Sequence, residues 1–122
     1  SGKAAKLIDK LATKIDSDLA DSLVKRSQDG FINLYRAVSS AEHEKLMEKG
    51  FENLKYITSD ISEAMSYMAN KGVDAKLLEI KMPIEIFTKM IESSGLMKGS
   101  YGEEFKMMSN SAKNVINKYI IK

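Results

Sequence analysis

The sequence predicts an α+β domain in which an N-terminal helix or helix pair precedes a compact, mostly antiparallel sheet with short helices. Apolar residues recur at helical spacing up to residue 27, and short apolar runs then alternate with capped helical stretches. A chain of 122 residues that is 43% apolar is long enough for one core. We therefore expect a helical prefix, residues 1–30, followed by an α+β domain, residues 31–122.

The helical prefix has one apolar face. Aliphatic side chains recur every four residues between 3 and 27, while lysine and aspartate fill the opposite face. The stripe consists of Leu7, Leu11, Ile15, Leu19 and Leu23. The run Asp16-Ser17-Asp18 could cap a second helix, which leaves one helix or two open. The turn signal SQDG, at 27–30, marks the internal boundary.

Strands and helices then alternate along the α+β domain. Ser39 and Gly50 are the start and end signals of a short helix. Pro83 ends an alternating strand and can open the next helix. The expected elements are strand 31–38, helix 41–49, strand 54–58, a helix ending near 71, strand 76–82, a helix after Pro83, a Gly-rich loop 95–102, and final strands 103–109 and 114–122, the last of which could instead be helical.

Composition excludes several kinds of site. The chain has no cysteine, which excludes disulfides, thiolate nucleophiles and cysteine zinc sites. The single histidine, His43, excludes multi-histidine metal sites. The net charge of +2 is not the strongly basic balance of many nucleic-acid binders. No apolar run approaches the ~20 residues that cross a bilayer. We expect a soluble domain that needs no metal cofactor.

Arg36 is the first candidate site residue. The chain has 19 Lys plus Arg, of which Arg26 and Arg36 are the two arginines, and Arg36 lies among apolar residues of the first expected strand. A guanidinium there needs an anion or several acceptors, because an unpaired buried charge is costly. Its planar fork can hold phosphate or carboxylate through two bonds. An anion site and a structural ion pair both fit this position.

Hydroxyl and carboxylate groups follow on the next strands. Thr58 and Ser59 lie between a strand and a helix N-terminus, where they could cap the helix or seat an anion. Glu104 and Lys106 share one strand face by alternation. A carboxylate beside Arg36 would suit proton transfer or a ribose oxygen. An arginine, a hydroxyl pair and a glutamate on three successive strands therefore predict a site.

One histidine and three tyrosines complete the candidates. His43, on the first short helix, is either an exposed helix residue or a general base or acid, because histidine exchanges protons near neutral pH. Tyr35, Tyr56 and Tyr101 each neighbour another candidate residue. Their rings could stack on a base or a nicotinamide. Packing in the core or at its rim is the alternative.

Four stretches, LYRAVSSAEHEKLMEKGF, KYITSDISEAMSYM, LLEIKMP and GEEF, carry a family resemblance. They resemble the C-terminal toxin domains of bacterial polymorphic and contact-dependent growth inhibition (CdiA-type) effectors over about residues 31–122. The resemblance implies secretion or cell-surface delivery within a larger protein, and antibacterial action in the cytoplasm of the target bacterium. It also implies a cognate immunity protein and, for some members, a target-cell helper such as a translation factor. For residues 1–30 it implies partner binding or entry.

The first chemistry that this resemblance implies is metal-independent ribonuclease action on tRNA, by a barnase-like or colicin-like fold. Arg36 and Lys106 would then hold the scissile phosphate and stabilise its developing charge. The hydroxyls at 58–59 would orient that phosphate. Glu104 or His43 would transfer protons to and from the ribose 2′-OH.

The second chemistry is ADP-ribosyl transfer from NAD, on a minimal transferase-like fold. Arg36, Thr58-Ser59 and Glu104 follow the Arg, Ser-Thr-Ser, Glu order of those enzymes, so that Arg36 would bind an NAD phosphate and Glu104 the ribose. The hydroxyl motif is half present, and the spacing from Arg36 to Ser59 is short for a domain that encloses a dinucleotide. Compactness thus favours the tRNA nuclease, with the transferase as the alternative. A non-catalytic binding module, such as an immunity or adaptor protein in which Arg36 is a structural pair, is the second alternative.

Overall fold

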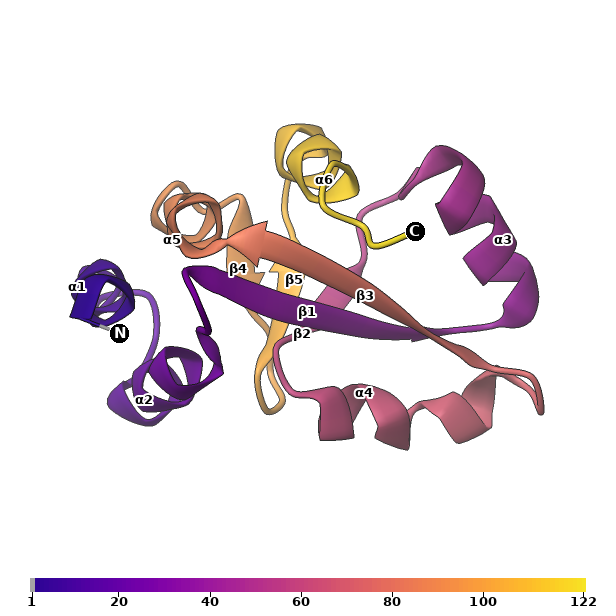
Figure 1. The fold of residues 1–122 in the computed structure, drawn as a ribbon, viewed down its shortest axis with the longest axis horizontal. Coiled ribbons are helices and arrows are strands. Elements are labelled where there is room, and N and C mark those ends of the chain that lie inside the picture. Colours follow the sequence, from indigo (N-terminus) through magenta and orange to yellow (C-terminus); the bar gives the residue numbers. More distant parts are fainter. Residues whose placement is uncertain (1) are drawn as a thin grey trace.

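The computed structural model describes residues 2–122, which form six α-helices, one 3₁₀ helix and a five-stranded antiparallel sheet (Figure 1). The predicted α+β class is therefore confirmed. The elements are α1 Gly2–Asp9, α2 Ser17–Arg26, β1 Phe31–Val38, α3 Ser40–Lys49, β2 Tyr56–Thr58, α4 Ile61–Ser66, the 3₁₀ helix η1 Met68–Lys71, β3 Lys76–Pro83, α5 Ile84–Glu92, β4 Leu96–Lys98, β5 Glu104–Met107 and α6 Asn110–Asn117.

The sheet has the strand order β3-β1-β2-β5-β4, and every neighbouring pair is antiparallel. β1 pairs with β3 along its whole length, from Phe31 opposite Pro83 to Val38 opposite Lys76. Between β1 and β2, in contrast, the ladder consists of Tyr35 opposite Thr58. Residues 36–38 of β1 therefore continue beside β3 without a partner from β2. This leaves room between β1 and β2.

Helices cover both faces of the sheet (Figure 1). α5 and α6 pack on one face, while α4 packs on β1 and β2 from the other. The first face carries the core, because alternate strand residues such as Leu34, Ile80 and Phe105 are fully buried there. Phe105 meets Phe87 of α5 edge to face, with ring centroids 5.3 Å apart.

The helical prefix is a helix pair, and its apolar stripe belongs to the core. Asp16 caps α2, since its side chain accepts a hydrogen bond of 2.8 Å from the Leu19 backbone N–H. Leu11 and Leu23 have no exposed surface and lie in the same hydrophobic cluster as the strand residues. The stripe is thus buried against the rest of the domain, except for Leu7, which is partly buried.

The structure corrects two predicted elements and divides a third. Of the two interpretations of residues 114–122, the strand is wrong and the helix is correct up to Asn117, because α6 begins at Asn110 after Ser109 caps it. The predicted loop 95–102 contains the short strand β4, which pairs with β5. The helix expected to end near 71 is two pieces, α4 and η1.

The chain beyond α6 runs along the outer side of β3. Ile120 forms an isolated bridge with Ile80. The Lys81 N–H donates to the Tyr119 carbonyl at 3.0 Å, and the Ile121 N–H donates to the Glu79 carbonyl at 2.9 Å. These bonds occupy backbone groups of β3 that β1 does not use.

Asn117 joins α6 to the turn after α3, and its loss should weaken the fold. Its Oδ1 accepts from the Phe51 N–H at 2.7 Å, and its Nδ2 donates to the Phe51 carbonyl at 3.1 Å. Asn117→Ala leaves both backbone groups without these partners, so we expect the free energy of unfolding to fall by about 2 kcal/mol. Urea denaturation measures this. The exposed Asn114→Ala on the same helix should cost less than about 0.5 kcal/mol, and equal losses would contradict the assignment.

Candidate functional site

Arg36 lies where β1 has left β2. Its side chain is 18% exposed. Nη1 donates to the Tyr56 carbonyl at 3.1 Å, and Nε lies 3.4 Å from Oε2 of Glu42. These two contacts hold the guanidinium between β1 and β2, and they use only part of its hydrogen-bond donors. Arg36 is therefore both a structural partner and a cation at the surface of a cleft.

The cleft consists of two adjoining hollows that share Arg36, Tyr56, Tyr67 and Glu104. The narrow one, of about 40 Å³, lies between the central strands and reaches Thr58. The wider one is an open hollow of about 370 Å³. We call the two together the Arg36–Glu104 cleft, and its polar and aromatic lining side chains are Tyr35, Arg36, Tyr56, Thr58, Tyr67, Ser100, Tyr101 and Glu104.

Register explains why residues far apart in the sequence meet in this cleft. Tyr35 is opposite Thr58, and Thr58 is opposite Glu104, so the three form one row across β1, β2 and β5. Thr58 is buried, and its Oγ1 accepts from the Asp60 N–H at 3.1 Å. The expectation that an arginine, a hydroxyl and a glutamate stand on three neighbouring strands is met by Arg36, Thr58 and Glu104.

Glu104 has an electrostatic environment that favours its neutral form. Burial raises its pKa, and the negative charge of Glu63 raises it further, while Lys98 and Arg36 oppose the shift; the net pKa is above the ordinary value. Glu63 can lie close to this segment because residue 102 is a glycine with a φ of +47°. A Cβ atom at that position would collide with Oε2 of Glu63. The Glu63 Oε1 atom is buried without a hydrogen-bond partner among the described residues.

Ser59 does not line the cleft. It is buried, and its Oγ donates to Oε1 of Glu103 at 2.7 Å. Of the hydroxyl pair considered from the sequence, Thr58 therefore faces the cleft, while Ser59 belongs to a separate polar cluster with Glu103 and Arg26.

Two further candidates lie outside the lining. His43 is a partly exposed residue of α3 and lines neither hollow. Lys106 is beside the cleft, since its Nζ lies 5.7 Å from the centroid of the Tyr56 ring and Lys106 is opposite Tyr56 in the sheet. The aromatic candidates Tyr35, Tyr56 and Tyr101 all line the cleft. Tyr101 is 71% exposed, so its ring is available to a ligand.

Tyr67 and Ser100 line the cleft but are not among the residues predicted from the sequence. Tyr67 follows Ala64 by three positions, and Ala64 packs on the sheet with 1% exposure. Residues three apart share a helix face. That spacing is a signal that could have identified Tyr67, whereas Ser100 has no comparable signal.

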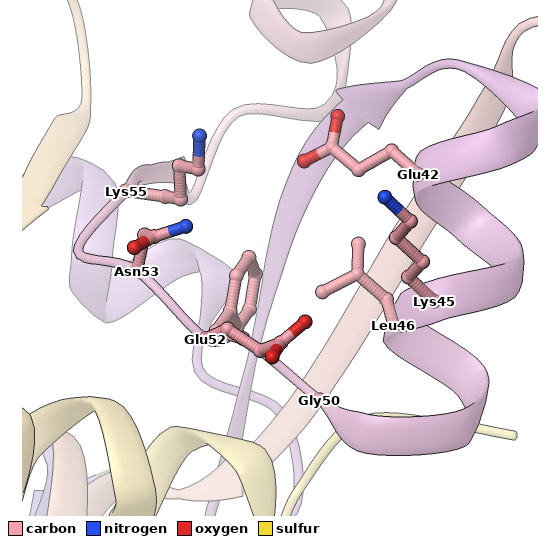
Figure 2. A pocket seen from close by; sticks show the side chains of 8 residues that line it. Glu42, Lys45, Leu46, Gly50, Glu52, Asn53 and Lys55 are labelled. Carbon is pink, nitrogen blue, oxygen red and sulfur yellow. The ribbon is translucent and has the colours of Figure 1, made fainter.

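A separate hollow, of about 250 Å³, lies between α3 and the segment that leads to β2 (Figure 2). Figure 2 shows Glu42, Lys45 and Lys55 around its opening. Its lining mixes both charge signs. The Arg36–Glu104 cleft is the better candidate site, because an arginine, a perturbed carboxyl and four tyrosines converge in it.

Within residues 2–122 there is no group of three or more His, Asp or Glu side chains arranged to hold a metal ion. None of the helices in that range has the length and apolar character to cross a bilayer. A scan of family models and searches of curated proteins and solved structures found no match to this chain.

Proposed function

We propose that the domain transfers ADP-ribose from NAD to an acceptor. The observation that carries this proposal is the meeting of Arg36, Thr58 and Glu104 in one cleft that four tyrosine rings and Ser100 also line. A cationic fork suits a pyrophosphate, aromatic rings suit a nicotinamide, and a lone carboxylate suits a developing positive charge on ribose.

The reaction would break the bond between the ribose C1′ and the nicotinamide nitrogen. Neutral nicotinamide leaves with the bonding electrons, the acceptor atom bonds to C1′, and the acceptor proton is released. Arg36 would bind the pyrophosphate through guanidinium N–H groups that the Tyr56 carbonyl and Glu42 leave free. The ionised Glu104 would accept a hydrogen bond from the ribose 2′-OH and stabilise the cationic sugar. With water as acceptor, the products are ADP-ribose, nicotinamide and a proton.

The ribonuclease hypothesis requires more catalytic groups than the lining of this cleft provides. Cleavage through the 2′-OH needs one group to remove a proton and another to supply one. Among the described residues that line the cleft, Glu104 is the one carboxylic acid, and the lining includes neither histidine nor lysine. One observation nevertheless favours RNA as a second candidate substrate: Lys106 stands over the exposed Tyr56 ring at the cleft edge, which is a suitable place for a stacked base and its phosphate.

Incubation of the purified domain with NAD, with nicotinamide release followed by chromatography, tests the proposal. We expect release by the native protein. Arg36→Lys keeps the charge and loses the fork, so it should raise the KM for NAD about tenfold. Lys49→Ala, an exposed change on α3, should leave both constants unaltered. No release, together with discrete tRNA fragments on a denaturing gel, would replace the transferase with the nuclease.

A bacterial test links this chemistry to the toxin resemblance. Inducible cytoplasmic expression should arrest growth while total RNA stays intact and cellular NAD falls or labelled ADP-ribose appears on an acceptor. A cognate immunity protein would then be expected to cover the Arg36–Glu104 cleft.

A further inference from the structure

Glu103 precedes Glu104, and all its polar groups are engaged. Its N–H donates to Oε2 of Glu63 at 3.2 Å, and its carbonyl accepts from the Ser59 N–H at 3.3 Å. Its Oε1 accepts from Ser59 Oγ and from Nε of Arg26, and its Oε2 accepts from Nη2 of Arg26 at 2.7 Å. The segment that leads into Glu104 is therefore held by α2, by α4 and by the connection between β2 and α4.

Arg26 is the part of this anchor that comes from the helical prefix. It lies in the last turn of α2, 77 residues before Glu103 in the sequence. Its guanidinium donates to both carboxylate oxygens of Glu103, and Oδ1 of Asp60 lies 3.7 Å from Nη2. Burial raises the pKa of Glu103, yet the hydrogen bonds from Arg26 and Ser59 outweigh that effect and lower it below the ordinary value. Glu103 is thus a paired carboxylate with a side chain that is only 14% exposed.

We infer that Arg26 is a positioning residue of the Arg36–Glu104 cleft, through which the helical prefix fixes the place of Glu104 and neutralises the adjacent Glu103 carboxylate. A bidentate pair fixes both the direction and the distance of the Glu103 carboxylate, which a lysine ammonium would not do. The prefix then contributes to the site itself, beyond the burial of its leucine stripe. The expected effect of Arg26 on NAD turnover rests on the proposed function, whereas its expected effect on the titration of Glu104 does not.

Removing Arg26 should change the titration of Glu104. The charged groups that face Glu104 are Glu63 from α4, Arg36 from β1 and Lys98 from β4, with Tyr67 and Tyr101 nearby. Without Arg26, the Glu103 carboxylate becomes a neighbouring negative charge that no arginine neutralises, and it disfavours the ionised form of Glu104. The start of β5 also loses its anchor.

The decisive experiment follows the side-chain carboxyl of Glu104 by carbon-detected NMR as the pH is varied, in the full chain. We expect Arg26→Ala to move the Glu104 titration upward by about half a pH unit or more. Arg26→Lys should move it by less. The double change Arg26→Ala with Glu103→Gln, which removes the stranded charge, should return it toward the native position. Lys25→Ala, an exposed change in the same helical turn, should have no effect.

Turnover of NAD provides the second readout. Arg26→Ala should lower kcat about tenfold with KM changed less than about twofold, because the change acts on Glu104 and not on the pyrophosphate anchor. A folded Arg26→Ala protein in which Glu104 titrates as in the native chain would overturn the inference. If Arg26→Ala unfolds, the Glu104 titration is measured in Arg26→Lys instead, and a titration identical to that of the native chain would overturn the inference. If the native protein does not consume NAD, the proposed function fails, and the NMR titration still judges the role of Arg26.

Discussion

Glu104→Gln should reduce NAD turnover about 100-fold or more while the domain stays folded. The amide has the shape of the carboxyl group but has no negative charge with which to stabilise a cationic ribose. Glu104 is partly exposed and forms no ion pair with any of residues 2–122, so the change should cost little stability. Nicotinamide release, with circular dichroism to confirm folding, measures the effect.

The pH profile of the native protein is the companion test of Glu104. The reaction needs its ionised form, and burial together with Glu63 raises its pKa. Activity should therefore fall with decreasing pH at values above the ordinary titration range of glutamate, near 4.3. Glu79→Gln, an exposed change on β3, is the matched control and should leave the rate and the acidic limb unaltered. A Glu104→Gln protein that keeps native turnover would remove Glu104 from the mechanism.

Residues 31–122 alone should not fold cooperatively. The buried large side chains that the prefix contributes are Ile8, Leu11, Ile15, Leu19 and Leu23. At roughly 2 kcal/mol each, their burial is worth about 10 kcal/mol. That is comparable to the whole stability of an ordinary domain, which is about 5–15 kcal/mol. We expect the shortened chain to lack a thermal transition in near-ultraviolet circular dichroism, where the full chain shows one.

Adding the prefix back separates lost packing from other effects of truncation. A peptide of residues 2–30 supplied in excess should restore the transition of the shortened chain, because binding to the folded form shifts the equilibrium. The same peptide with Leu11→Ala and Leu23→Ala should restore much less, since both side chains are fully buried. A shortened chain that melts as the full chain does would show that the prefix is dispensable.

Much of the fold could be predicted because its signals are local. Asp16, Ser39 and Pro83 act at the helix starts where their side chains predict them to act. β4 was missed because three residues are too few for a period of two. The segment from 114 left strand and helix open because Val115, Ile116 and the isoleucines after them have high β-propensity, which the Ser109 cap and the burial of one helix face outweigh.

The site was predictable where residue type carries the chemistry, and less so where partners are distant. Arg36 stands out alone, as an arginine among apolar strand residues of a lysine-rich chain, whereas Glu104 became a candidate only together with Arg36 and the hydroxyl pair. The destination of Ser59 depends on Glu103, 44 residues later, and that of Glu103 on Arg26, 77 residues earlier. Such pairings follow from the strand order β1-β2-β5, which the linear sequence does not specify.

The backbone bonds from the tail beyond α6 to β3 have a consequence for association between molecules. An eight-residue strand with unpaired amides and carbonyls is a template on which another chain can add a strand. Residues 119–121 occupy part of that template, and the opposite rim of the sheet is β4, three residues long. Residues 119–121 thereby cover part of this edge against pairing with another molecule, and we expect changes in this segment to affect solubility.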